Sequence, residues 1–415
     1  MVGSALAPRD NATFDALQSK RPLQSAQPIP PEVLNYRADS PLRLDRDSLV
    51  ASLRTSSRGS SAGPGGCTYE HLRCVLDDPY LLELFCDAME ELARAEIPAD
   101  ICSAITMANM TALQKRDGGI RGIAAGSTLR RLVAKTLARQ FGSVFDSACA
   151  PFQYALSTRA GTDCVGHAVR FLTDSDPKLT VLGIDGIGAY DNVLRASMLG
   201  KLLETDAAPI LPFVLMSYGQ PSEYRWVDRN GESRSVRQAE GGEQGDPLMP
   251  ALFSLGIHNA LEAVNEKLDE GEFLFAFLDD VYAVAMPDRI RTIFDLLAEE
   301  LRVRSGISLH LGKTRTWNKA GIEPKGMSEL GNDIWSPEGI RILGIPIGTE
   351  EFVSKFVIDR LEEEARLWKA IPTVQDLQCA WQLLLQSASP RFNHMARTLP
   401  PSMVAEYARG HDDGI

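Results

Sequence analysis

The chain has 415 residues, of which 44% are hydrophobic and 24% are charged, a composition typical of a globular protein long enough for two or three domains. Its seven cysteines and six histidines are scattered without a CxxC pair or a zinc-ligand spacing, which excludes a disulfide framework and a structural zinc site. The first residues lack the pattern of a signal peptide, and the longest uncharged apolar stretch, residues 207–218, is too short to span a bilayer. We therefore expect an intracellular protein of the nucleus or cytoplasm, neither secreted nor inserted in a membrane.

The formal net charge of −12 is unusual for a nucleic-acid-binding protein, because contacts with phosphates require basic surface. The charge is unevenly distributed, however. Residues 109–147 contain seven basic and two acidic side chains. A local basic face of this kind can bind phosphates although the whole chain is acidic.

The N-terminal third is expected to begin with disorder and to continue with helices. Residues 1–44 predict a poorly ordered tail, because Pro28, Pro30, Pro31 and Pro41 interrupt any helix and apolar periodicity is lacking. Residues 56–66 form a Ser/Gly-rich loop. Helices are expected over 80–95 and 127–145, and in the second the apolar residues recur at helical spacing while the basic residues lie mainly on its other faces.

From Thr180 onward the pattern changes to short apolar strands separated by helices. Strands are expected over 180–185, 224–227, 233–237, 273–278, 281–285 and 340–343. Helices are expected over 192–203, 247–268, 290–303, 352–370 and 374–386. Asn230-Gly231 is a strong hairpin signal between the second and third strands. This order of elements predicts an α+β fold.

Three aspartates stand where predicted strands end. Asp185 closes the strand that starts at Thr180, and Asp279-Asp280 lie between two apolar strands. Neighbouring carboxylates in apolar surroundings are costly unless a cation or hydrogen bonds compensate their charge. Mg²⁺ accepts a few carboxylate oxygens and keeps positions for water and substrate phosphates. Taken alone, these residues are also explained by a hairpin turn at Asp279-Asp280 and a helix cap at Asp185.

A series of short motifs, taken in their order along the chain, favours the metal site over the turn and the helix cap. The motifs are SAGPGGCTYEHL (61–72), LQKRDGGIRGIAAGSTLRRLVAK (113–135), GIDGIGAYDNV (183–193), EQGDPLMPALF (243–253), FLDD (277–280), LHLGKT (309–314) and ILGIPIG (342–348). In this order they resemble the opening block, the fingers block and palm motifs A to E of reverse transcriptases from non-LTR (LINE-type) retrotransposons. The resemblance covers roughly residues 60–352. It implies a right-hand polymerase with a ferredoxin-like palm, helical fingers and a partial helical thumb.

The resemblance implies a two-metal site at the acids. Asp185 of motif A and Asp279 of motif C would be the main metal ligands, with Asp280 in support and the backbone carbonyl of Gly186 nearby. These acids would be the catalytic residues. The metal would be Mg²⁺, bound as two ions ~3.5–4 Å apart, with Mn²⁺ as a substitute.

Further matching positions would bind the incoming nucleotide. Tyr190 corresponds to the aromatic steric gate that collides with a 2′-hydroxyl and so favours deoxynucleotides. Gln244 and Gly245 of motif B would contact the nucleotide and template, with Gly245 allowing a close backbone approach. Lys115 and Arg121 of the fingers block would hold the triphosphate.

Other matching positions carry subsidiary roles or depart from the family pattern. Lys313 of motif D is a candidate general acid toward pyrophosphate, whereas Asp191 is assigned a structural role. Gly122 stands where the family usually has proline, and Leu278 stands where alanine or valine is commoner.

The expected domains are a tail (1–44), fingers (45–150), a palm with some fingers elements (151–350) and a partial thumb (351–415). The expected function is that of an RNA-directed DNA polymerase, which adds dNTPs to the 3′-hydroxyl of a DNA or RNA primer on an RNA template. A catalytically decayed or domesticated fragment that only binds nucleic acid remains as an alternative, supported by the acidic charge and the short thumb. A viral-type RNA-dependent RNA polymerase is disfavoured by Tyr190 and Leu278, and Asp191 breaks a dinucleotide-binding glycine pattern.

Overall fold

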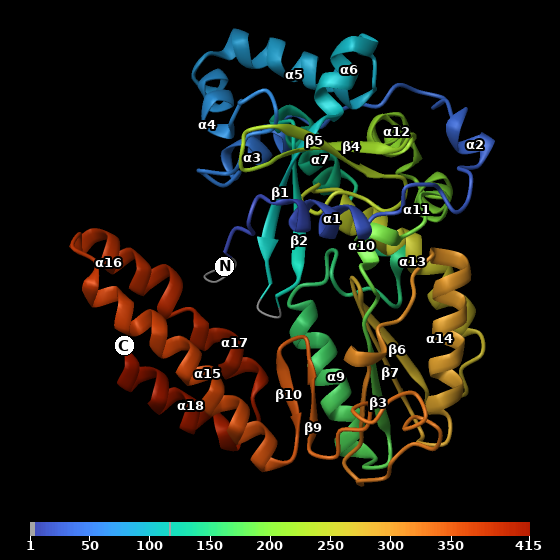
Figure 1. The fold of residues 1–415 in the computed structure, drawn as a ribbon, viewed down its shortest axis with the longest axis vertical. Coiled ribbons are helices and arrows are strands. Elements are labelled where there is room, and N and C mark those ends of the chain that lie inside the picture. The colour runs from blue at the N-terminus through green and yellow to red at the C-terminus, as the bar shows by residue number, and fades with distance from the viewer. Residues whose placement is uncertain (1–4, 116–117) are drawn as a thin grey trace. The chain divides into compact units, whose positions relative to one another are not determined.

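The computed structural model describes residues 5–115 and 118–415, which form two compact units (Figure 1). Unit 1 contains the residues up to Ser157 together with Gly186–Val264 and Leu297–Ser308. Unit 2 contains Thr158–Asp185, Asn265–Leu296 and Leu309–Ile415. Because the chain passes repeatedly from one unit to the other, these units do not coincide with the predicted segments. The division into fingers, palm and thumb therefore stays a prediction.

Unit 1 is mainly helical and carries one sheet. Its helices are α1 (Asn11–Ser19), α2 (Pro31–Leu34), α3 (Arg46–Arg54), α4 (Tyr69–Leu72), α5 (Pro79–Ala93), α6 (Ala99–Thr106), α7 (Thr128–Gln140), α8 (Gly142–Cys149), α10 (Ala189–Asn192), α11 (Arg195–Leu203), α12 (Leu211–Tyr218) and nearly all of α13 (Met249–Asn265). Its strands are β1 (Ala108–Gln114), β2 (Ile120–Gly126), β4 (Ser222–Val227) and β5 (Ser233–Gln238).

The expectation of a poorly ordered tail over 1–44 is wrong for the described residues from Ala5 onward. Asp10 caps α1 by accepting a hydrogen bond from the backbone N–H of Thr13 at 2.9 Å. Leu17 is fully buried, and Arg21 just beyond the helix is 5% exposed. The prolines do not prevent this order, because Pro31 occupies the first turn of α2, where proline is tolerated.

The sheet of unit 1 has the order β2-β1-β4-β5. The antiparallel β1–β2 hairpin, which was not among the expected strands, includes the pair Ala112↔Gly122. β1 pairs in parallel with β4 at Ala108↔Tyr224, and the expected hairpin at Asn230-Gly231 joins β4 to β5. Apolar side chains from the N-terminal segment, α1 included, and from these strands form the core of this part, namely Ala7, Leu17, Ala108, Met110, Ala112, Ala124, Tyr224, Trp226 and Val236.

Unit 2 contains a second sheet, a β-hairpin and a helical C-terminal region. Its helices are α9 (Gly161–Ser175), α15 (Glu350–Ala370), α16 (Leu377–Leu383), α17 (Arg391–Thr398) and α18 (Pro401–Gly414), while α14 (Ile290–Ser305) runs from unit 2 into unit 1. Its strands are β3 (Thr180–Ile184), β6 (Phe273–Phe277), β7 (Asp280–Ala285), β8 (Arg315–Trp317), β9 (Gly339–Ile342) and β10 (Ile345–Gly348).

The sheet of unit 2 is antiparallel, with the order β6-β7-β3-β8. Of the four strands of this sheet, the first and the last in chain order, β3 and β8, are neighbours, and the two between them in the sequence, β6 and β7, form a hairpin. This is the strand order of a ferredoxin-like fold, as the sequence predicts for the palm. All five residues of β3 are buried, which explains why the strand after Thr180 has no polar side chain rather than an alternating pattern.

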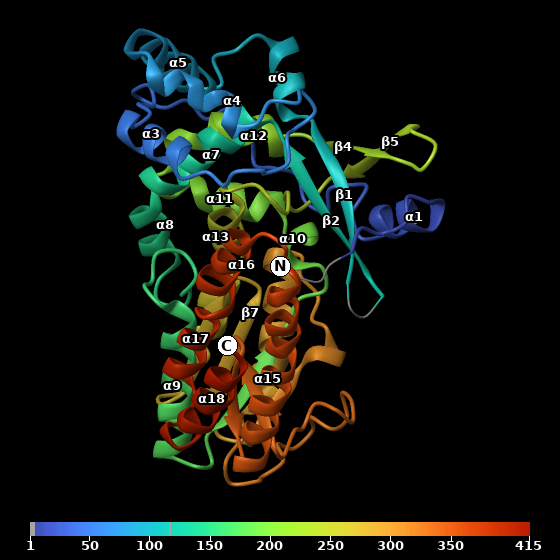
Figure 2. The same ribbon diagram turned by 90° about the vertical axis from the view of Figure 1, so that its left-hand side faces the viewer.

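The C-terminal helices of unit 2 pack on one another through a small apolar core. Figure 2 shows α15, α17 and α18 running alongside one another. Val353, Val357, Met395, Leu399 and Tyr407 are the buried members of this core. A buried carboxylate, Glu364, is satisfied within it by the Tyr407 hydroxyl, which donates at 2.8 Å.

Membrane-crossing helices were sought over 5–115 and 118–415, and every helix there is too short or too polar to traverse a bilayer.

Candidate active site

Strand register brings two of the predicted acids face to face in unit 2. β3 and β7 are antiparallel, and the last pair of their ladder is Ile184↔Val281. One step further, Asp185 therefore lies opposite Asp280, where cross-strand neighbours are about 4.5–5.5 Å apart. The backbone carbonyl of Asp185 is fixed by the N–H of His310, which donates at 2.8 Å. Residues 95 positions apart in the chain thus meet because two apolar strands pair.

The third acid lies in the tight turn that connects β6 and β7. Phe277 pairs with Asp280, so Leu278 and Asp279 alone make the turn. Leu278 has a φ of +56°, a left-handed conformation that costs a branched side chain about 1–2 kcal/mol. The family departure at this position is therefore also a point of backbone strain, of the kind that collects at functional sites.

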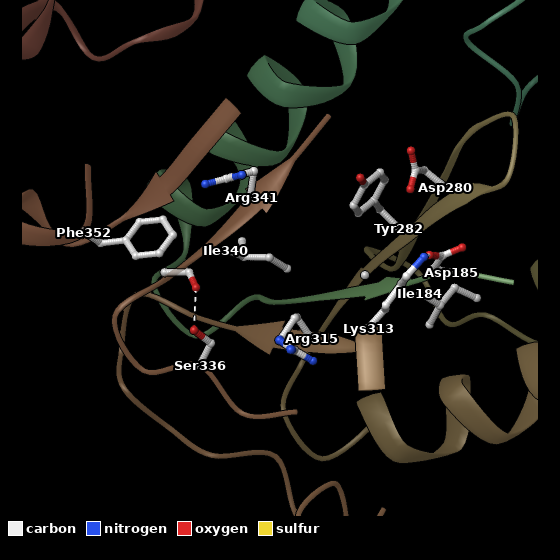
Figure 3. Close-up of a pocket in the computed structure, with 12 residues that line it drawn as sticks. Ile184, Asp185, Asp280, Tyr282, Lys313, Arg315, Ser336, Ile340, Arg341 and Phe352 are labelled. Carbon is white, nitrogen blue, oxygen red and sulfur yellow. Dashed lines mark hydrogen bonds and ion pairs between the residues drawn. The ribbon is translucent and has the colours of Figure 1, made fainter. Parts of the chain in front are cut away.

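Asp185 and Asp280 line one cavity of about 440 Å³ (Figure 3). The acids are at one end, with Lys313 beside Asp185. Arg315 and Arg341 contribute positive charge to the wall. The remaining lining is Gly183, Ile184, Tyr282, Ser336, Gly339, Ile340 and Phe352.

The charges in this cavity act strongly on Asp280. Burial, and after it the negative charges of Asp279 and Asp185, raise the pKa of Asp280 from 3.8 to about 6, while Lys313 opposes the shift. The Lys313 ammonium forms an ion pair with Asp185. Lys313 is 55% exposed, and an exposed pair of this kind is worth about 0–1 kcal/mol. Lys313 therefore neutralises part of the acidic cluster but is weakly held there.

The acids fit a divalent cation chemically, although they are not arranged as a finished cage. Within 5–115 and 118–415, no three acidic, histidine or cysteine side chains form a ready metal-binding group. Asp185 and Asp280 are nevertheless hard oxygen donors on one cavity. Burial and, after it, repulsion between the acids raise the pKa of Asp280, and this is the penalty that a bound cation removes. Metal binding by Asp185, Gly186, Asp279 and Asp280 stays a prediction.

Tyr282 is a site residue that sequence reasoning missed. It follows Asp280 by two positions on β7 and lines the same cavity. Its hydroxyl accepts a hydrogen bond from the N–H of Leu343 at 3.3 Å, at the turn between β9 and β10. Burial, and then the charge of Asp280, raise its pKa well above the usual range, so it stays a neutral phenol. Tyr282 thereby ties β7 to the β9–β10 hairpin.

The predicted nucleotide-binding residues belong to unit 1. Tyr190 stacks on Phe253 with ring centroids 4.6 Å apart and parallel planes. Phe253 is 1% exposed and lies on α13, so the Tyr190 ring packs against a buried side chain of a helix. Gly186 is the first residue of Gly186–Val264, the segment of unit 1 that also contains Tyr190. A Cβ at Gly186 would lie 2.7 Å from Cγ2 of Ile307, so a larger residue does not fit there without a shift.

Gln244 and Gly245 are held against the β1–β2 hairpin. The N–H of Ala124 donates to the carbonyl of Gln244 at 3.2 Å. Gly245 has a φ of +138°, and a Cβ there would lie 2.6 Å from the carbonyl oxygen of Ala124. The requirement for glycine is therefore explained inside the chain, by a close approach to β2.

Lys115 and Arg121 belong to the same hairpin. Arg121 pairs with Leu113 across β1 and β2, and Lys115 follows β1 directly. Both side chains are exposed, as phosphate-binding groups need to be. The pKa of Asp191 is raised by burial, and the charges of both residues act in the opposite direction. The basic face inferred from residues 109–147 is thus partly presented on a hairpin.

A buried ion pair supports the motif B helix, and sequence reasoning missed it. Arg130 on α7 contacts Glu243, and both side chains are almost completely buried. The Tyr218 hydroxyl donates to Asp246 at 2.6 Å. The other carboxylate oxygen of Asp246 accepts from the N–H of Leu248 at 2.9 Å, directly before α13 begins at Met249.

A family model described as "Reverse transcriptase (RNA-dependent DNA polymerase)" matches residues 113–347. The chain belongs to this family. Its members generally use divalent metal ions, and the description itself implies a nucleic-acid template. This reverse transcriptase chain is also similar to the retrotransposable element SLACS 132 kDa protein of Trypanosoma brucei gambiense, with 23% identity over 346 residues. Those residues are 83% of this chain and 28% of the SLACS protein, so the chain spans little more than a quarter of that relative.

Solved structures similar to this reverse transcriptase include two telomerases. The apo telomerase from Candida tropicalis, truncated from its C-terminal domain, has a TM-score of 0.45 and 14% identity, over 60% of this chain and 54% of that chain. The telomerase from Candida albicans in complex with a TWJ fragment of telomeric RNA has a TM-score of 0.43 and 14% identity, over 81% and 64%. Scores this low carry no conclusion about this chain.

The prediction of a reverse transcriptase domain from a non-LTR retrotransposon is confirmed by the family match and by the retrotransposon relative. The predicted α+β polymerase fold is confirmed by family membership and by the ferredoxin-like strand order. The enzyme class, an RNA-directed DNA polymerase, is confirmed at the level of the family.

Proposed function

We propose that this chain is the polymerase part of a retroelement reverse transcriptase and that Asp185, Asp279 and Asp280 hold its two Mg²⁺ ions. It would extend a DNA or RNA primer with dNTPs on an RNA template. The observation that carries the proposal is the convergence of Asp185 and Asp280 on one cavity, where burial and, after it, the neighbouring acids raise the pKa of Asp280 to about 6. Lys313 neutralises only part of this acidic cluster, and the cost of gathering these carboxylates at adjoining strand ends is one that a structural role does not explain.

The residues of the cavity would divide the chemistry as follows. Divalent ions bound by the acids would activate the primer 3′-hydroxyl and stabilise the leaving pyrophosphate. Asp185 and Asp280 have backbones fixed by strand pairing and by His310, so they keep their orientation at low reorganisation cost. Lys313, an exposed ammonium on Asp185, would leave this partner when a cation binds and become available to give a proton to pyrophosphate.

The nucleotide would be bound by residues of unit 1. Lys115 and Arg121 would attract the triphosphate as a point charge and a bidentate donor, respectively. Tyr190, supported by Phe253, would exclude a 2′-hydroxyl. Gln244 would contact the incoming nucleotide and template.

Primer extension on an RNA template with Mg²⁺ and dNTPs tests the proposal. The wild-type protein should extend the primer, and Asp279→Ala and Asp280→Asn should each reduce the rate by at least about 10²-fold, as expected when a charge-stabilising group of an active site is lost. Glu270→Gln is a matched control, because Glu270 is an exposed acid of unit 2 outside the cavity. It should extend at the wild-type rate.

Two outcomes would contradict the proposal. Equal extension by wild type and Asp279→Ala would show that the acids are not the catalytic centre. Tight binding of primer–template without extension by the wild type would favour the alternative, a domesticated fragment that only binds nucleic acid. Parallel reactions with ribonucleotides separate a reverse transcriptase from an RNA-dependent RNA polymerase, since the proposal expects strong preference for dNTPs.

A further inference from the structure

Arg21, a residue of the N-terminal segment, reaches into the core of unit 1. It follows α1 and its side chain is only 2% exposed. Its Nη1 donates to the carbonyl of Leu17 at 2.7 Å, and its Nε donates to Oε1 of Gln238 at 3.1 Å. Its Nη2 lies 3.3 Å from Oδ1 of Asp191. The guanidinium is therefore fixed on three sides, and its remaining charge is directed at one buried carboxylate.

Asp191 connects this arginine to the predicted nucleotide-binding residues. It is 6% exposed and directly follows Tyr190 in α10. Its Oδ2 accepts from the side-chain amide of Gln244 at 3.5 Å, and its backbone carbonyl accepts from Gln238 at 3.4 Å. Burial raises the pKa of Asp191, and Arg21 is the strongest of the charges that oppose the shift. Removing Arg21 would therefore leave a buried carboxylate without its main counter-ion.

The opposite wall of the Arg21 site explains a departure from the family. Gly122 on β2 stands where the family usually has proline. A Cβ at Gly122 would lie 2.6 Å from Nη2 of Arg21, 2.8 Å from Sδ of Met110 and 3.0 Å from Cδ2 of Leu17. The space that a proline ring would need is thus occupied by side chains from α1 and β1. The absence of a side chain at Gly122 therefore leaves the space that the Arg21 guanidinium occupies.

We propose that Arg21 is a positioning residue of the nucleotide-binding site, which it orders through Asp191 by fixing the adjacent Tyr190 and the amide of Gln244. Gly122 leaves room for the Arg21 side chain, because it has no Cβ. The role rests on the proposed function, because Tyr190 and Gln244 are nucleotide-binding residues only in a polymerase. It lies outside the family match, which begins at residue 113.

The test compares Arg21→Met, which keeps bulk but loses charge, with Arg37→Met. Arg37 is an exposed arginine of the same N-terminal segment and serves as the matched control. Arg21→Met should raise the KM for dNTP by about tenfold or more, with a smaller fall in kcat, and should narrow the preference for dNTP over rNTP. Its Kd for primer–template should stay within about twofold of wild type. Arg21→Lys, which keeps the charge, should recover part of the dNTP affinity.

A purely structural role for Arg21 predicts a different result. It would lower the unfolding midpoint but leave the KM for dNTP and the sugar preference unchanged at temperatures where the variant is folded. That result, or an Arg21→Met protein indistinguishable from Arg37→Met, overturns the proposal. Gly122→Ala provides a second arm. The added methyl should raise the KM for dNTP when Gly122→Ala is made in the wild-type protein. It should raise this KM less when Gly122→Ala is combined with Arg21→Met, because the flexible methionine side chain can move away from the methyl.

The unfolding of single and double variants separates this inference from the proposed function. Arg21→Met and Asp191→Asn should each lower the urea midpoint more than Arg37→Met does, and the double variant should lose less than the sum of the two. If wild type extends primers but Arg21→Met keeps the wild-type dNTP parameters, the inference fails and the polymerase assignment stands. If wild type is inactive, the polymerase assignment fails, and additive unfolding effects would then overturn the Arg21–Asp191 coupling as well.

Discussion

Replacing Asp280 by asparagine should stabilise the metal-free protein while it abolishes catalysis. The folded protein raises the pKa of Asp280 from 3.8 to about 6, so near neutral pH the ionised carboxylate opposes folding. A pKa difference of this size corresponds to a ceiling of about 3 kcal/mol. Because the side chain is only partly buried, screening by water reduces the expected gain for Asp280→Asn to about 1–2 kcal/mol at pH 8.

The sign of the pH dependence follows from proton binding. Between about pH 4 and pH 6 the folded state holds the Asp280 proton more tightly than the unfolded state does. The free energy of unfolding must therefore fall as pH rises through this range. Above pH 6 this contribution stays at its low plateau. A divalent cation bound at the acids should restore the lost stability, because it favours the ionised carboxylates.

Urea unfolding of wild type and Asp280→Asn at pH 4.5, 6 and 8, with EDTA and with Mg²⁺, measures these effects. The difference between the free energies of unfolding of the two proteins at each pH cancels the contributions of the titrating groups that they share. With EDTA, the advantage of Asp280→Asn should be near zero at the lowest pH and should grow toward pH 8. With Mg²⁺ it should shrink. A pH-independent difference, or a variant less stable than wild type at pH 8, would refute the reasoning about charge repulsion at this site.

Three further predictions concern the supporting structure. Glu243→Gln should lower the free energy of unfolding by about 3–5 kcal/mol in urea titrations, because it strands the buried Arg130 guanidinium; adding Arg130→Met should recover part of the loss. Phe253→Ala should cost about 3–5 kcal/mol and, by removing the ring beneath Tyr190, should increase ribonucleotide incorporation measured against dNTP, whereas unchanged sugar preference would show that the stacking is dispensable. Leu278→Gly should raise the free energy of unfolding by up to about 1 kcal/mol, because glycine adopts the positive φ without strain; Leu278→Ala, which keeps the strain, should show no gain.

The palm strands could be predicted because local pattern and tertiary environment agree there. The strands at Thr180, Phe273 and Asp280 are short apolar runs ended by acids, and the structure contains them within one or two residues of the expected bounds. Their meeting at Asp185 and Asp280 was inferred from motif order rather than from pattern. The register Ile184↔Val281 then supplies the physical reason.

Other features are not encoded locally and were missed or misjudged. The predicted helix 127–145 is interrupted after Gln140, with Phe141 and Gly142 marking the break. The helix expected over 374–386 begins later, at Leu377, and continues beyond α16 as a π-helical segment to Ala388; α17 and α18 follow it. The Ala108–Gln114 strand was missed because its residues mix polar and small side chains. No local signal links Arg21 to Asp191, since their pairing depends on a core assembled from distant segments.

The position of Arg21 has a practical consequence for how the enzyme is produced. A fragment cut at the limits of the family match, residues 113–347, would keep the palm motifs apart from the last residue of ILGIPIG. It would also lack Arg21, whose guanidinium lies beside Asp191, and Leu17, whose side chain packs over Gly122. Such a fragment could look like a decayed enzyme for reasons of truncation alone. Recombinant protein intended for activity measurements should therefore start upstream of Asp10, the residue that caps the helix leading to Arg21.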